Sequence, residues 1–181
     1  MVMSDIAPGK LELVRLFVNT ADLEDGTDAL AAPPALARWL EEHDLARGAA
    51  ATESDAAAAR ELREAIRGLL LENNGARARE ESAATLSRTA ERARLALRFE
   101  AAGEARLEPA APGVEGALGR LVAIAAAAMA DGTWRRLKAC QADPCGWAFY
   151  DHARNHSRRW CSMAVCGNRT KARSYRRRHA A

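Results

Sequence analysis

The chain's four cysteines are the residues whose spacing most clearly points to chemistry. Four residues separate Cys140 from Cys145, fifteen follow, and four again separate Cys161 from Cys166. A short gap lets two thiolates turn toward one metal ion, and two such pairs complete the tetrahedron of Zn–S bonds of about 2.3 Å that Zn²⁺ accepts. Because four thiolates leave no position open for water, the pattern predicts one structural Zn²⁺ ion rather than a catalytic one.

Other roles for the thiols are two disulfides, unrelated buried cysteines, or redox sensing. The start of the chain, MVMSDIAPGK, lacks the apolar core of a secretory signal, so we expect a cytoplasmic protein whose thiols stay reduced. His152 and His156 are four residues apart and are further candidate ligands, but four cysteines already satisfy the metal. We therefore expect the two histidines to lie outside the metal site.

The residues around the cysteines fit a small module organised by a metal. Gly146 and Gly167 each follow a cysteine pair, where a left-handed backbone conformation would reverse the chain. A segment of about fifty residues cannot bury a large apolar core, so we expect Trp147, Phe149 and Trp160 to pack around the metal.

Charge is divided unevenly along the chain. Residues 131–181 contain twelve Lys or Arg against three Asp, a balance of +9, whereas residues 1–130 have a balance of −6. Coding bias explains the excess of Arg over Lys, but it does not explain why acidic residues become so scarce after Asp131. Clustered guanidinium groups without acidic neighbours favour an anionic partner such as phosphate.

A terminal helix is expected to begin at Asn168, which can cap it, and to carry much of this basic charge. A solvated charged tail is the alternative to a phosphate-binding surface. The candidate nucleic-acid contacts are Arg154, Arg158, Arg159, Arg169, Lys171, Arg173, Arg176, Arg177 and Arg178. Tyr150 or Tyr175 could in addition stack on a base.

Upstream of the cysteines, apolar residues recur mainly with helical spacing. The pattern predicts helices after Pro33-Pro34, from about Ser54 to the stop at Asn73-Asn74-Gly75, over 80–93, and from Val114 to Asp131. Alternation at 95–99 and 105–108, interrupted near Gly103, predicts a β-hairpin. The segment LELVRLFVNT at 11–20 fits helix and strand equally well.

These patterns predict an α+β fold in two parts. Residues 1–131 would form a mainly helical domain with a β-hairpin, and residues 132–181 a four-cysteine zinc-binding module that ends in a basic helix. The most apolar run, at 121–130, has ten residues, far fewer than the ~20 that cross a bilayer as a helix. We therefore interpret it as a buried helix and expect no membrane partner.

The segment Cys161 to Arg169, CSMAVCGNR, closely resembles the CGNR zinc-finger family, together with WAFYD at 147–151 and KARSYR at 171–176. Farther upstream, LFVNT at 16–20, the leucines and Trp39 through residue 40, and LREA at 62–65 resemble the ABATE domain that precedes this finger in many bacterial proteins. The resemblance implies a stress-induced transcription regulator with a DNA-binding finger. One position departs from the pattern, since His156 stands where a basic residue or glycine is expected.

The sequence therefore favours a zinc-containing nucleic-acid-binding protein, with DNA as partner more than RNA and transcriptional regulation as the role. Alternatives are an RNA-binding protein and a protein-interaction module whose N-terminal domain senses an unknown small molecule. Asn19, Thr20 and Arg63 are candidates to line such a pocket, although turn formation and an ion pair explain them more simply. We expect no enzyme, because neither a nucleophile with its base nor an open metal position is recognisable.

Overall fold

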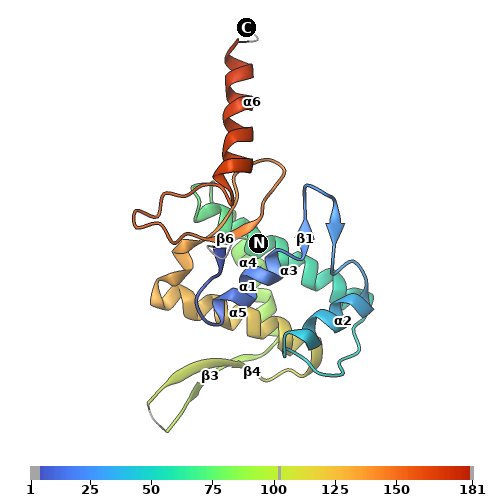
Figure 1. Ribbon diagram of the computed structural model, residues 1–181. Coiled ribbons are helices and arrows are strands. Elements are labelled where there is room, and N and C mark those ends of the chain that lie inside the picture. The colour runs from blue at the N-terminus through green and yellow to red at the C-terminus, as the bar shows by residue number, and fades with distance from the viewer. Residues whose placement is uncertain (1–4, 102, 180–181) are drawn as a thin grey trace.

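The structure, a computed structural model, describes residues 5–101 and 103–179. Its N-terminal part is mostly helical with small hairpins, and it is followed by a four-cysteine module ending in a helix, so the fold class is α+β as predicted. The terminal helix α6 (Asn168–His179) projects from the body, and the hairpin β3–β4 projects on the opposite side (Figure 1).

The expected N-terminal helices are all present, and the ambiguous segment at 11–20 also forms a helix. Leu11, Val14 and Phe17 lie on its buried face, which explains why helix prevails over strand there. In the described residues of this part the α-helices are α1 (Leu11–Val18), α2 (Pro33–Glu42), α3 (Glu53–Glu72), α4 (Glu80–Arg92) and α5 (Gly113–Asp131).

Helix α5 is the one described helix that is long and apolar enough to cross a membrane by length and composition. Half of its apolar window is buried inside the protein, where Leu121 and Ala125 are inaccessible to solvent. It packs against α1 and α4, so it serves as a core helix of the fold rather than as a clear span.

The described strands form three antiparallel pairs. The predicted hairpin is present as β3 (Leu95–Phe99) and β4 (Ala105–Pro109), with Leu97 opposite Leu107. Two shorter pairs were not predicted: β1 (Ala21–Asp22) with β2 (Thr27–Asp28), and β5 (Leu137–Ala139) with β6 (Ala148–Tyr150). Segments of two or three residues are too short to show a periodic pattern.

The β5–β6 hairpin lies between two apolar clusters. Leu137, Ala139, Ala148 and Tyr150 belong to the large core formed with the N-terminal helices, whereas Phe149 belongs to a smaller cluster that contains the cysteines. Side chains alternate across a strand, so one short hairpin contributes to both clusters. The cysteine module is therefore packed against the N-terminal part.

A partly buried ion pair holds the β1–β2 hairpin to α3. Arg63 donates to both carboxylate oxygens of Asp28, at 2.6 and 2.9 Å, and to the Thr20 hydroxyl, which itself donates to the Phe17 carbonyl. Thr20 and Arg63 thus have structural partners, in agreement with the simpler interpretation of these residues. The Arg63 hydrogen bond holds the pKa of Asp28 below its ordinary value.

We expect Asp28→Asn to lower the free energy of unfolding at pH 7 by about 3 kcal/mol, because it leaves the buried Arg63 guanidinium without its main counter-ion. Since the folded-state pKa of Asp28 is lowered, its stabilisation is complete above the unfolded pKa of about 3.9 and is lost as the pH falls below it. Urea unfolding should therefore show the full difference between the two proteins at pH 7 and a smaller difference at pH 3. A constant difference across that range would contradict the assignment.

Candidate metal centre and basic surface

The four cysteine sulfurs converge on one point. All four Sγ atoms lie within 4.8 Å of one another, and the Cys161 sulfur is 3.7 Å from that of Cys145 and 3.6 Å from that of Cys166. Sulfurs that share a tetrahedral zinc ion with Zn–S bonds of about 2.3 Å would be about 3.8 Å apart. No disulfide joins these cysteines. The cluster is consistent with one zinc site.

Ionisation of the thiols also fits a cation. Hydrogen bonds from the thiols of Cys145 and Cys161 lower the pKa of Cys140 to about 2. Hydrogen bonding with Cys140 raises the pKa of Cys145 to about 12, and it also raises the pKa of Cys161. Thiolates this close together repel one another, whereas a divalent ion at the centre would allow every sulfur to ionise.

The predicted aromatic surroundings are confirmed, because Phe149 is buried beside the cysteines and Trp147 and Trp160 pack against the same cluster. The prediction for the glycines is right for Gly146, whose φ is 56°, and wrong for Gly167, which does not adopt a positive φ. A Cβ at Gly167 would lie 2.5 Å from the Met163 sulfur, but that side chain is exposed and can move, so the structure does not require glycine there.

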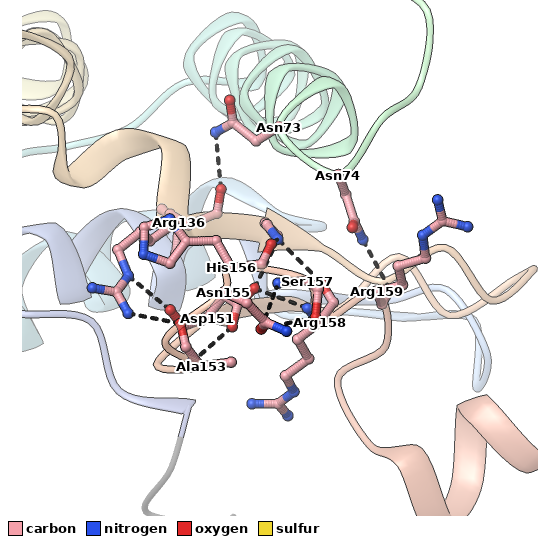
Figure 2. A network of polar contacts seen from close by, with 12 residues as sticks. Asn73, Asn74, Arg136, Asp151, Ala153, Asn155, His156, Ser157, Arg158 and Arg159 are labelled. Carbon is pink, nitrogen blue, oxygen red and sulfur yellow. Dashed lines mark hydrogen bonds and ion pairs between the residues drawn. The ribbon is translucent and has the colours of Figure 1, made fainter.

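A buried ion pair between Lys138 and Asp151 organises the loop between the two cysteine pairs, and Figure 2 shows Asp151 within the polar contacts of this loop. Lys138 Nζ lies 2.7 Å from Asp151 Oδ2, with the two side chains 6% and 0% exposed, and it also donates to the carbonyls of His156 and Arg158. Asp151 accepts from the backbone N–H groups of Ala153 and Arg158. Burial tends to raise the pKa of Asp151, but these donors outweigh it and the pKa is lowered.

Two asparagines at the end of α3 fix the module to the N-terminal part (Figure 2). Asn73 donates to the carbonyls of Trp134 and Leu137, and Asn74 to those of Ala139 and Arg159. The sequence marked these residues only as a helix stop. Their side chains in fact donate hydrogen bonds to backbone carbonyls that precede Cys140 and, in the case of Arg159, follow Cys145 in the sequence.

A second attachment comes from the end of α1 and from α3. Asn19 forms two hydrogen bonds with the backbone of Ala148, donating to its carbonyl at 2.9 Å and accepting from its N–H at 2.7 Å. Arg67 donates to the carbonyls of Gly146 and Val18. Asn19 is thus an attachment point for β6, and sequence reasoning missed this role because its partner lies 129 residues away.

The terminal helix begins earlier than predicted. A π-helical turn, η3 (Met163–Gly167), runs directly into α6, and the Ser162 hydroxyl caps it by accepting from the Val165 N–H. Asn168 therefore starts the α-helical part but is not the cap. The described part of α6 contains no buried residue.

Two of the nine predicted basic contacts form ion pairs within the protein, and a third, Arg173, donates to the Asp143 carbonyl. Arg158 pairs with Asp5 at 2.6 Å, lies over the Phe149 ring at 4.7 Å and donates to the Trp160 carbonyl. Arg169 pairs with Glu24 and also contacts the Cys166 sulfur. In the described residues the other seven form no ion pair and are exposed: Arg154, Arg159, Lys171, Arg173, Arg176, Arg177 and Arg178.

The structure also places the two candidate histidines and the two tyrosines considered for base stacking. His152 contacts the Ile6 carbonyl at 2.9 Å, and His156 adopts a positive φ of 50°, which suits a position where glycine is expected. Neither belongs to the cysteine cluster. Tyr150 is buried, so of the two tyrosines only Tyr175, 58% exposed on α6, is accessible to a base.

A shallow groove separates α6 from the first cysteine loop. Its volume is about 640 Å³, and three arginines contribute to its lining. The lining residues are Gln141, Asp143, Thr170, Arg173, Arg176 and Arg177.

Two short cysteine loops that close on one point, followed by a basic helix, define a zinc-finger protein. Residues 136–179 match the CGNR zinc finger, and residues 12–132 match the ABATE family, described as "Putative stress-induced transcription regulator". The chain belongs to this family, with its ABATE domain followed by the CGNR finger. The description of the family names a regulator and no catalytic activity. No match is found among curated proteins.

Proposed function

We propose that the protein binds duplex DNA through α6 and the adjacent cysteine loop and thereby regulates transcription from the cytoplasm of its cell. One Zn²⁺ ion, held by Cys140, Cys145, Cys161 and Cys166, would fix the loops from which α6 projects. The observation that carries this proposal is the distribution of charge around α6, a helix with no buried residue and no acidic residue.

Basic residues occupy two opposite sides of α6. With about 3.6 residues per turn, Arg169, Arg173, Arg176 and Arg177 fall on one side, whereas Lys171 and Arg178 fall on the other. The first side also borders the groove described above. A helix lying on a flat phosphate surface would need one basic side only. Two such sides suit a helix inserted between two phosphate walls.

The shape of the major groove of the nucleic acid favours DNA over RNA as the partner of α6. The major groove of B-DNA is about 12 Å wide and admits an α-helix, whereas the major groove of A-form RNA is deep and narrow. In the proposed complex Arg173, Arg176 and Arg177 on one side of α6 would contact one strand, and Lys171 and Arg178 on the other side would contact the second strand. Arg154 and Arg159 would extend the contact from the loop between the cysteine pairs, and Tyr175 faces solvent on the same helix.

Salt dependence tests the electrostatic part of the proposal. If about six phosphates are contacted, the log–log slope of affinity against salt is expected to be about −5. Removing one side of the helix with Lys171→Ala and Arg178→Ala should reduce the magnitude of that slope by about 2, as should Arg176→Ala with Arg177→Ala. Fluorescence anisotropy with a labelled 20-bp duplex measures each slope.

The matched control is Arg98→Ala, on the hairpin β3–β4 that projects opposite α6 (Figure 1). It should leave the slope unchanged, and a duplex RNA of equal length should compete poorly. Equal competition by RNA would favour the RNA-binding alternative. A flat salt response would refute nucleic-acid binding and leave the protein-interaction alternative.

A further inference from the structure

Arg169 differs from the other basic residues of α6 in having partners on both sides of it. Its Nη1 and Nη2 atoms face the two carboxylate oxygens of Glu24, with Nη2 at 2.8 Å from Oε2. Nη2 also lies 3.4 Å from the Cys166 sulfur. One guanidinium group thus joins a carboxylate of the N-terminal part to a cysteine of the metal centre.

The Arg169 side chain is more enclosed by the protein than that of Arg177 on the same helix. Its side chain is 26% exposed, and its Nε atom is buried without a hydrogen-bond partner among the described residues. Arg177, on the same side of α6, is exposed and forms no ion pair in the part of the chain that the structure describes. Because the Nη1 and Nη2 groups of Arg169 already contact Glu24 and Cys166, they are not free to form a bidentate hydrogen bond with a phosphate.

Glu24 lies in the turn between β1 and β2, the same hairpin that Arg63 attaches to α3. Leu23, beside it, approaches the first cysteine loop, because a Cβ on Gly146 would lie 2.8 Å from its Cδ1 atom. The turn is therefore held against the metal centre by more than the ion pair. This fixed support gives Arg169 a defined orientation toward sulfur.

We propose that Arg169 is a positioning residue for the metal centre, donating a hydrogen bond to the Cys166 thiolate while Glu24 holds its guanidinium in place. An N–H donor spreads the negative charge of a zinc-bound thiolate and keeps its sulfur oriented. Groups that orient metal ligands in this way typically change metal affinity by about 10- to 100-fold when removed. The N-terminal domain thus supports the zinc ion through Glu24, and this inference rests on the zinc site proposed above.

The test measures zinc release from the full-length protein to a colorimetric chelator, without nucleic acid. We expect Arg169→Ala to release zinc about tenfold faster than the unmodified protein. Glu24→Gln should show a smaller acceleration, because it frees the guanidinium without removing it. Arg169→Lys, which keeps the charge but cannot reach both partners, should also release zinc faster. Asp25→Asn, one residue along the same turn, should not differ from the unmodified protein.

A spectroscopic measurement separates this role from general destabilisation. In the cobalt-substituted protein, Arg169→Lys and Glu24→Gln should shift the thiolate-to-metal charge-transfer band, whereas Arg177→Ala should not. Arg177→Ala should instead reduce the salt slope of DNA binding by about 1, and Glu24→Gln should leave that slope unchanged.

Three results would each count against a defined claim. Absence of zinc from the purified protein would refute the zinc site itself. Zinc present but released at the same rate from Arg169→Ala and Glu24→Gln would refute the role of Arg169 alone. A steeper salt slope in Glu24→Gln, with unchanged zinc release, would show that Arg169 contacts phosphate and that Glu24 competes for it.

Discussion

Removal of zinc by a chelator is expected to disorder the two cysteine loops and α6 while α1 to α5 stay folded. The small cluster around the cysteines contains only five buried residues, and α6 buries none, so the metal supplies most of the stability of this part. Structural zinc sites bind with apparent free energies of about 10–16 kcal/mol, which would be lost here. Removal of zinc should also lower the affinity for DNA, because α6 would no longer be attached to ordered cysteine loops.

Hydrogen exchange read by mass spectrometry resolves this prediction along the chain. Peptides covering 140–147 and 158–179 should exchange rapidly after chelation, whereas α3 and β5 should stay protected by the large core. Cys145→Ser should reproduce the effect, and added Zn²⁺ should restore protection in the unmodified protein but not in this variant. Unchanged exchange at 158–179 after complete removal of zinc would contradict a metal-organised module.

Loss of the Asp151 carboxylate is the second change expected to have a large effect. Asp151→Asn keeps the size of the side chain, but its single acceptor oxygen cannot serve both the Ala153 and Arg158 N–H groups, which donate to different oxygens of Asp151. It also leaves the Lys138 ammonium buried without a counter-ion. Breaking a buried pair in this way costs about 3–5 kcal/mol. Thermal unfolding of the zinc-loaded protein should show a much lower Tm.

A double variant distinguishes the uncompensated charge from a general packing defect. Combining Asp151→Asn with Lys138→Met removes the buried charge, so the double variant should be more stable than Asp151→Asn alone. Ser157→Ala, in the same loop but at an exposed position, should change the unfolding free energy by less than about 0.5 kcal/mol. If Asp151→Asn were as stable as the unmodified protein, the ion pair would not organise the loop.

Local patterns were sufficient to predict the longer elements. The alternation at 95–99 identified β3, and the spacing of Leu62 and Ile66 identified α3, because each pattern extends over several residues of one element. The segment at 11–20 remained undecided, since its apolar residues satisfy both periods. Packing of α1 against α3 and α5 decides for helix, and no local pattern contains that information.

The cysteines of the candidate site could be predicted, but the state of the arginines around them could not. Counting charge treated Arg158 and Arg169 like Arg177, whereas Asp5 and Glu24 neutralise the first two across the fold. Glu24 is 145 residues away from Arg169 in sequence. Contacts of that kind follow from how α3 and the β1–β2 hairpin are assembled, and a single sequence does not reveal them.

The hairpin β5–β6 contributes side chains to both apolar clusters and so connects the cysteine module, from which α6 extends, to the N-terminal part. The twelve residues of α6 extend about 18 Å at about 1.5 Å per residue. A tilt of a few degrees in α3, transmitted through Asn73 and Asn74, would sweep the far end of α6 sideways by about an ångström. The positions of the arginines on α6 would therefore change with the orientation of α3.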